Sequence, residues 1–239
     1  YFGFVNFNQK KLGEKMNLKK LFNKYNISLT DKQEKMFEKY FNFLIKTNEK
    51  LNLTAITEEK DVEIKHFLDS VLPYSEFLKN ATVIDIGSGA GFPGIPLKII
   101  RPDLKIVLVD SLNKRVNFLN ETINLLEMKD IIAVHSRAED FARLNREKFD
   151  YAVARAVAPL NTLVEYLLPL IKLDGCALIY KSAKLDEEIV EAEKAIKILG
   201  GKIEKVLEYD CSEENMERKI LFLKKVKPTP NKYPRDKNK

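Results

Sequence analysis

One string in the sequence, IDIGSGAGFPGIP from Ile84 to Pro96, constrains the fold more than any other. It opens with a short apolar run containing β-branched residues, which is typical of a buried strand. Gly87, Gly89 and Gly91 then permit a tight turn and let a ligand approach the backbone closely. The prolines that follow fit the first turn of a helix, whose free N–H groups can face that ligand. The string therefore predicts a strand–turn–helix unit with a ligand at the turn.

The glycine turn can be aligned with two nucleotide-binding patterns. The residues from Gly89 to Gly94 match the dinucleotide pattern G-x-G-x-x-G. Counted from the strand, the turn instead reads D-x-G-x-G-x-G beginning at Asp85, the acid-led form typical of methyltransferases. In a dinucleotide site the first glycine follows closely on the strand, but that glycine is Gly87 here, and its third partner would be Phe92. The register favours S-adenosylmethionine, with an NAD-dependent oxidoreductase as the alternative.

Segments typical of strands and of helices alternate from Ala81 onward, which indicates a mostly parallel sheet with helices on both faces. Two final strands, separated only by a polar loop, should form an antiparallel pair. This order implies an α/β fold, a Rossmann-like class I methyltransferase sheet, by analogy of architecture. The expected strands after the first are Lys105–Asp110, Ile131–His135, Phe149–Ala154, Ala177–Lys181, Ile203–Tyr209 and Lys219–Val226, and the helices are Pro93–Ile100, Asn113–Glu127, Glu139–Leu144, Leu160–Leu170 and Asp186–Leu199.

The first third of the chain is expected to be helical. Asn17–Tyr25 forms a short amphipathic pattern, Thr30 can cap a helix that begins at Asp31, and Glu58–Leu78 predicts one or two helices broken near Pro73. We therefore divide the chain into an extension or alternative start at 1–15, a helical region at 16–80, a methyltransferase domain at 81–226 and a basic tail at 227–239.

Candidate ligand contacts follow the later strands, at the edge of the sheet where such folds bind their ligands. Asp110, followed by Ser111, ends the second strand and can accept hydrogen bonds from both ribose hydroxyls of an adenosyl group. Ala138 and Glu139 follow the third strand and can border adenine. Arg155 follows the fourth strand and can orient the cofactor or the substrate base, although a surface ion pair is the alternative.

The sequence contains little chemistry suited to hydrolysis or metal binding. His66 and His135 are its two histidines, no Cys/His cluster suits a metal, and no nucleophile has a recognisable base partner. No catalytic residue is identified, and the role expected of Arg155 is to orient the cofactor or the substrate base. These residues suffice for methyl transfer to an aromatic ring nitrogen, because that nitrogen already has a lone pair and the enzyme needs only to align the reactants and exclude water.

Charge is concentrated near the end of the chain. The chain has a net charge of +6, and residues 218–239 hold nine Lys and Arg against one acid. A basic tail favours a polyanionic partner such as nucleic acid, although it could simply be solvated. No apolar run approaches the length of a membrane span. Cys176 lies in an apolar strand-like run and Cys211 lies beside acids, so we expect two free thiols and no disulfide. We expect a cytoplasmic protein without a membrane segment.

Several strings together resemble one enzyme family, the bacterial small-subunit ribosomal RNA guanine nitrogen-7 methyltransferases of the RsmG type, also called glucose-inhibited division protein B. The resemblance covers roughly Met16 to Arg235, and VDSLNKR joined to GAGFPGIPL is its most specific part. Tyr1–Lys15 does not resemble the family, and the tail is shorter than in many relatives. The matching strings are NEKLNLTAIT, KHFLDS, DIGSGAGFPGIPLKI, VDSLNKRVNFL, SRAE, ARAVAPL and TPNKYPR.

The resemblance implies S-adenosylmethionine as cofactor and nitrogen-7 of a guanine, at family position 527, in 16S ribosomal RNA as target. The partner would be that RNA or the small ribosomal subunit, and a monomer is expected. A non-enzymatic RNA-binding module stays open as a further alternative. The family's cofactor contacts carry over to Gly87, Phe92, Asp110, Ala138, Glu139 and Arg155, and on charge grounds the candidate RNA contacts are Lys114, Arg115, Lys181 and Arg218.

Overall fold

A computed structural model of the chain describes residues 18–182, 184–211 and 216–235. Within these ranges seven strands form one sheet in the order β3-β2-β1-β4-β5-β7-β6. Neighbours among β1 to β5 are parallel, whereas β7 lies between β5 and β6 and is antiparallel to both. The α/β fold and its antiparallel final pair are confirmed. The strands are β1 Thr82–Ile86, β2 Lys105–Asp110, β3 Ile131–His135, β4 Phe149–Arg155, β5 Ile171–Lys181, β6 Gly201–Cys211 and β7 Met216–Lys225.

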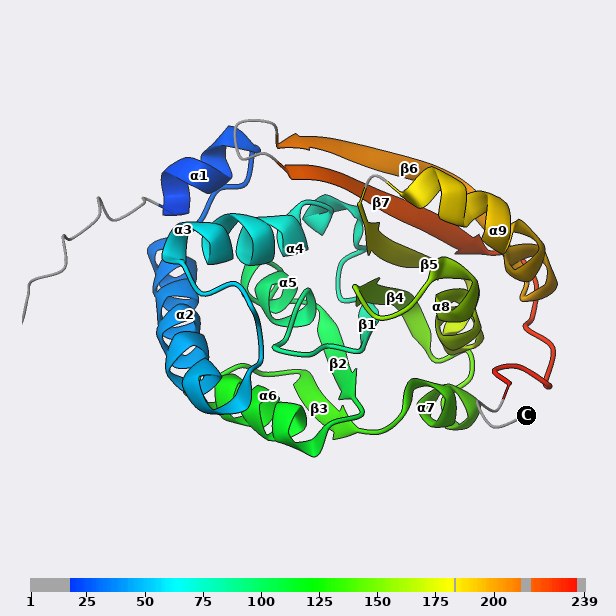
Figure 1. Cartoon of the computed structure of the whole chain (residues 1–239), viewed down its shortest axis with the longest axis horizontal. Helices are drawn as coiled ribbons and strands as arrows, with labels where there is room; N and C mark the ends of the chain where they lie inside the picture. The colour runs from blue at the N-terminus through cyan, green and yellow to red at the C-terminus, as the bar shows by residue number, and fades with distance from the viewer. Residues whose placement is uncertain (1–17, 183, 212–215, 236–239) are drawn as a thin grey trace, which may run out of the picture.

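The central strands are apolar because both of their faces are covered by helices. In β1, Val83 belongs to the apolar core on one side of the sheet, while Ile84 and Ile86 belong to the core on the other. Figure 1 shows the two helical layers. On one side lie α1 Leu18–Lys24, α2 Asp31–Leu51, α5 Gly94–Ile100 and α6 Asn113–Leu125, and on the other lie α7 Ala138–Leu144, α8 Leu160–Leu167 with the 3₁₀ turn Leu168–Leu170, and α9 Leu185–Ile198.

Helix α2 begins where its sequence predicts. The Thr30 hydroxyl accepts a hydrogen bond from Gln33 N, and the Gln33 side chain accepts one from Thr30 N, so both donors at the helix start are satisfied. The buried side chains Phe37, Tyr40 and Leu44 face the core beneath α2. The apolar stripe of this helix is therefore part of the core.

The next helical segment contains a wide turn that the sequence pattern does not predict. It runs as α3 Glu59–Val62, a π-helical stretch Glu63–Leu68 and α4 Asp69–Val71, and a 3₁₀ helix at Tyr74–Glu76 follows Pro73. Helices broken near Pro73 were expected. The π-helical stretch, a feature often found at functional sites, contains His66.

Strand β5 is six residues longer than predicted, because it begins at Ile171 rather than Ala177. The extra part contains Asp174 in a left-handed conformation and Gly175, and the pairing with β4 changes register beside it. The residues Leu173-Asp174-Gly175 are typical of a turn, so this bulged start could not be recognised as strand from the sequence.

The basic C-terminal segment packs onto the body of the protein as far as Arg235. Buried Lys225 donates to Leu168 O and to the Thr229 hydroxyl, and Arg146 donates to Tyr233 O at 2.7 Å. Arg235 forms an ion pair with Glu165 of α8. Residues 227–235 are therefore part of the folded unit rather than a solvated appendage, and residues 236–239 lie outside the described ranges, as do residues 1–17.

Within the described ranges, no helix is both long and apolar enough to cross a membrane. Cys176 is a buried free thiol.

Candidate functional site

Two cavities adjoin at the glycine turn, beyond the carboxyl ends of the parallel strands, where ligands bind in open α/β sheets. Gly87, Arg115 and Ala156 line both of them. The first, the β2 cavity, has a volume of about 680 Å³ and is lined by Gly87, Asp110, Ser111, Ala138, Glu139 and others. The second, the His66 cavity, has a volume of about 530 Å³ and is lined by Thr54, His66, Asp69, Phe92, Arg155, Lys181 and others.

The glycine turn is held open toward these cavities. Gly87 N and Ser88 N both donate to Val109 O, at 2.8 and 3.1 Å, which fastens the turn to β2. Gly87 and Gly89 have positive φ angles of 72° and 58°. A Cβ on Gly89 would find its nearest neighbour, Gly87 O, 3.9 Å away, so that position faces open space. The absence of side chains therefore leaves the backbone of the turn accessible to a ligand.

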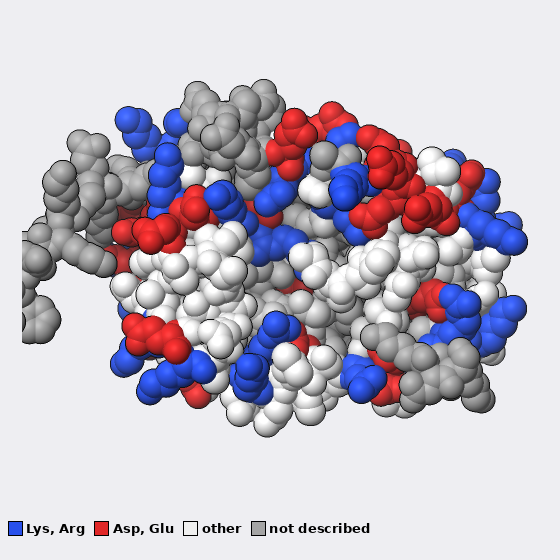
Figure 2. All heavy atoms as spheres, viewed as in Figure 1, with Lys and Arg blue, Asp and Glu red and all other residues white. Residues whose placement is uncertain are grey.

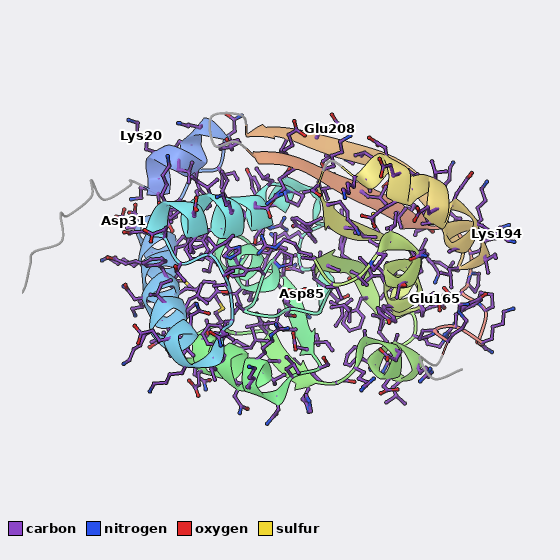
Figure 3. The ribbon with its side chains drawn as sticks, in the orientation of Figure 1. Lys20, Asp31, Asp85, Glu165, Lys194 and Glu208 are labelled. Atoms are coloured by element: carbon purple, nitrogen blue, oxygen red, sulfur yellow. The ribbon has the colours of Figure 1, made fainter. Side chains whose placement is uncertain are left out.

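Asp85 and Gly91, two predicted cofactor contacts, lie behind the turn rather than in the lining of either cavity. Asp85 lies near the centre of the molecule at the end of β1 (Figure 3), fully buried, and its Oδ2 accepts a hydrogen bond from Gly94 N at 2.9 Å. Burial raises the pKa of Asp85 to about 7. A Cβ on Gly91 would lie within 3 Å of Ile95 and Tyr40. These two residues shape the turn and fasten α5 to the sheet.

Asp110 connects the turn to the end of β2. Its Oδ2 accepts from Gly89 N at 2.9 Å, and its Oδ1 accepts from Leu112 N at 2.9 Å. Arg115 lies 3.4 Å from the same carboxylate. Each carboxylate oxygen has two lone pairs, and Arg115 Nη1 also donates to Oδ2, so Oδ1 keeps one lone pair for a ligand in the β2 cavity.

The remaining predicted adenine-side residues lie where β3 leads into α7. Ser111, Ala138 and Glu139 line the β2 cavity together with Asp110. Glu139 is largely buried and has Arg137 as an ion-pair partner at 3.8 Å. Five predicted residues from separate parts of the chain thus line one cavity, and they are Gly87, Asp110, Ser111, Ala138 and Glu139.

Arg155 forms a buried ion pair rather than the surface pair that was the alternative reading. Its Nη1 donates to Asp69 Oδ2 at 2.7 Å, and Arg218 Nε donates to Asp69 Oδ1 at 2.8 Å. Asp69 is only 1% exposed. The Arg155 guanidinium also lies over the Phe92 ring, 5.0 Å from its centroid. Both guanidiniums are therefore held in fixed positions at the wall of the His66 cavity.

His66 lines the cavity but was not predicted from the sequence to be a site residue. Its ring stacks on Phe92 with centroids 4.4 Å apart, and its nitrogens contact Arg155 and Thr54. Burial, reinforced by the nearby Arg155 charge, lowers the pKa of His66 to about 3, so the ring is neutral at physiological pH. The sequence feature that could have identified His66 is its spacing from Asp69 in KHFLDS, which places both residues on one helix face.

Three of the four candidate RNA contacts, Arg115, Lys181 and Arg218, line the His66 cavity. Lys181 has an ion-pair partner there in Glu188, at 2.6 Å. Lys114 lies outside the cavity and donates to Leu51 O at 3.1 Å. Figure 2 shows Lys and Arg side chains at the borders of a hollow near the centre of the face in view.

Comparison with solved structures supports the fold. A SAM-dependent methyltransferase from Aquifex aeolicus superposes with a TM-score of 0.57 at 19% identity, covering 73% of this chain and 97% of that one. The ribosomal protein L11 methylase from Lactobacillus delbrueckii subsp. bulgaricus gives a TM-score of 0.54 at 19% identity, covering 68% of this chain and 79% of that one. Identities this low establish the architecture alone.

Comparison of sequences establishes the family. A protein named ribosomal RNA small subunit methyltransferase G from Desulforamulus reducens is 50% identical over 91% of this chain and 92% of its own length. One of the same name from Lachnoclostridium phytofermentans is 52% identical over 87% and 88%. The profile of the GidB family, described as rRNA small subunit methyltransferase G, matches residues 33–221. This chain belongs to the GidB family of rRNA small subunit methyltransferase G.

Proposed function

We propose that this protein transfers a methyl group from S-adenosylmethionine to nitrogen-7 of a guanine, at family position 527, in 16S ribosomal RNA. Membership of the GidB family supports the reaction and the RNA, since relatives that match nearly the whole chain are named for the small-subunit ribosomal RNA. The structural observation that carries the proposal is the meeting of two cavities at Gly87, which gives cofactor and base adjoining places.

The β2 cavity has the groups that an adenosyl cofactor requires. Asp110 can accept from a ribose hydroxyl, and Gly87, which has no side chain, lets a ligand approach the backbone of the turn closely. Ala138 and Glu139 border the place expected for adenine. S-adenosylmethionine supplies a methyl group on a sulfonium, a donor that is reactive without further activation.

The chain's own residues contribute alignment and exclusion of water. Nitrogen-7 of guanine has a lone pair in the ring plane and carries no proton, so its methylation requires no general base. As the new bond forms, positive charge passes from sulfur to the base. Phe92 and the neutral ring of His66 give the His66 cavity an aromatic wall, and Asp69 holds Arg155 at its side. Such a site accelerates the reaction by positioning.

The RNA reaches the site, in this proposal, across the basic residues around the cavities. Lys114, Arg115, Lys181 and Arg218 are the candidate contacts, and phosphate contacts of this kind make affinity fall steeply with salt. The partner is the 16S RNA or the small subunit, and the enzyme acts as a monomer in the cytoplasm.

The choice of cofactor is tested by thermal-shift titration of the purified protein. S-adenosylhomocysteine, the product of methyl transfer, should raise the melting temperature while NAD leaves it unchanged, because only a ligand that binds the folded state stabilises it. Stabilisation by NAD alone would support the oxidoreductase alternative instead. A protein that binds the RNA and neither ligand would be the non-enzymatic module.

A further inference from the structure

The loop between α2 and α3 reaches the His66 cavity through Thr54, and Asn48 holds it there. Asn48 Oδ1 accepts from Leu53 N at 2.6 Å and from Thr54 N at 2.8 Å, and Asn48 Nδ2 donates to Thr54 O at 2.9 Å. The backbone N–H and C=O of Thr54 are thus both held by the Asn48 side chain, near the end of α2. Within the string NEKLNLTAIT, Asn48 therefore holds the loop so that Thr54 lines the cavity.

The contacts of His66 determine which of its nitrogens carries the proton. Nδ1 lies 3.3 Å from Arg155 Nη2 and 3.1 Å from Lys65 O. A guanidinium N–H can only donate, so Nδ1 must be the acceptor of that bond. Lys65 O still accepts a hydrogen bond, because Arg155 Nη1 donates to it at 3.1 Å. The ring proton therefore resides on Nε2, which donates to Thr54 Oγ1 at 2.9 Å.

This arrangement leaves Thr54 with one unused hydrogen-bonding group. A threonine hydroxyl has two acceptor lone pairs and one proton. Ile56 N donates to Thr54 Oγ1 at 3.1 Å, and His66 Nε2 donates to the same oxygen, so both lone pairs are occupied. This hydroxyl forms no further hydrogen bond among the described residues. Because Thr54 lines the His66 cavity, its proton is available to a ligand there, and the group acts as a donor only.

We propose that Thr54 is a specificity-determining residue, which donates its hydroxyl proton to O6 of the target guanine, and that His66 is a positioning residue, which fixes the direction of that bond. The inference rests on the proposed function. Guanine presents O6 and nitrogen-7 as neighbouring acceptors on one edge, whereas adenine presents an amino donor in place of O6. A hydroxyl that can only donate forms a hydrogen bond to O6 of guanine. Against adenine it would face the amino group, which is also a donor, so the hydroxyl selects guanine.

The test uses small-subunit RNA joined to a synthetic oligonucleotide that carries guanine, inosine or 2-aminopurine at the methylated position. All three bases retain nitrogen-7, but 2-aminopurine lacks O6 and inosine keeps it. For the unaltered enzyme, kcat/KM on 2-aminopurine should be at least roughly tenfold below that on guanine, the order expected when a buried donor loses its partner. Inosine should retain the O6-dependent part of the rate.

The decisive variant is Thr54→Val, which keeps the shape of the side chain and removes the hydroxyl. Its kcat/KM on guanine should fall roughly tenfold, and its guanine to 2-aminopurine ratio should fall by about the same factor, since no donor is left to lose its partner. Thr54→Ser should keep the ratio of the unaltered enzyme. Affinity for S-adenosylhomocysteine, measured by calorimetry, should be unchanged in both variants.

The positioning role of His66 is tested with His66→Phe, which keeps a ring against Phe92 and removes the Nε2 donor. Its guanine to 2-aminopurine ratio should fall by several-fold, because a hydroxyl that no longer accepts from His66 Nε2 can turn its proton away from O6, which weakens the bond to guanine alone. An unchanged ratio in Thr54→Val overturns the assignment of Thr54, and an unchanged ratio in His66→Phe overturns that of His66. If the unaltered enzyme methylates no guanine in this RNA, the proposed function fails instead.

Discussion

The carboxylate of Asp110 accepts a hydrogen bond from the backbone N–H of Gly89 at 2.9 Å, which joins the end of β2 to the glycine turn that follows β1. The two strands are parallel neighbours, so their carboxyl ends lie side by side. The same carboxylate borders the β2 cavity. One acid thus shapes the turn and faces the place proposed for the cofactor ribose.

Asp110→Ala should weaken binding of S-adenosylhomocysteine by about 10- to 100-fold, because hydrogen bonds to a charged group contribute roughly 1.5–3 kcal/mol each. Isothermal calorimetry measures the change. The protein should remain folded in circular dichroism. Equal affinity in the variant and the unaltered protein would remove Asp110 from the cofactor site.

Gly89→Ala should impair cofactor binding more than it impairs folding. The added Cβ meets no protein atom closer than 3.9 Å, but it enters the space in front of the turn, and the backbone there has a φ of 58°. The matched control is Gly94→Ala, whose Cβ would lie 2.3 Å from Leu108 and 2.8 Å from Asp85, so that variant should mainly lose stability. Urea unfolding and calorimetry separate the two effects. A Gly89→Ala protein with normal affinity would place the ligand elsewhere.

Asp69→Asn should destabilise the protein by about 3 kcal/mol, because Arg155 and Arg218 would both lose the carboxylate between them. The comparison variant is Glu193→Gln, which breaks an exposed pair with Lys197 and should leave the free energy of unfolding nearly unchanged. Chemical denaturation of both variants gives the two values. Similar small losses would mean that the Asp69 pairs add little to stability.

Asp85 should make the protein less stable as the pH rises from about 4 to about 7. Its pKa is about 7 in the folded protein against a usual value of 3.8, so over this range the unfolded chain releases the proton first. Ionisation therefore favours the unfolded chain, by no more than about 4 kcal/mol. Asp85→Asn keeps an oxygen for Gly94 N and cannot ionise, so its stability relative to the unaltered protein should increase across the range. Urea unfolding at several pH values would reveal a pH-independent difference if Asp85 titrated normally.

Local patterns in the sequence were enough to predict most of the fold. Strands β2 and β3 have the bounds expected from their apolar runs, and Thr30 caps α2 because its side chain and that of Gln33 act at short range. The bulged start of β5 could not be predicted, because Asp174 and Gly175 favour a turn locally and the pairing with β4 overrides that preference.

The residues that line the β2 cavity, the proposed cofactor side of the site, could similarly be grouped from the sequence, since they follow strands whose ends meet at one edge of the sheet. Asp85 and Gly91 were placed in that set by the motif, but the turn folds over them, so their atoms face the core. His66 and Thr54 could not be assigned individually. His66 contacts Arg155, 89 residues away, as well as Phe92, and Thr54 contacts His66, so the group depends on tertiary packing.

The most direct measurement is the location and chemistry of the methyl group added to small-subunit RNA from cells lacking this modification. After incubation with the protein and S-adenosylmethionine, mass spectrometry of nuclease fragments should find one guanosine heavier by one methylene unit. Reduction and aniline treatment should cleave the RNA at that nucleotide, as expected for a nitrogen-7 methylated guanine. Methylation of another base, of another atom of guanine, or of no nucleotide would contradict the account.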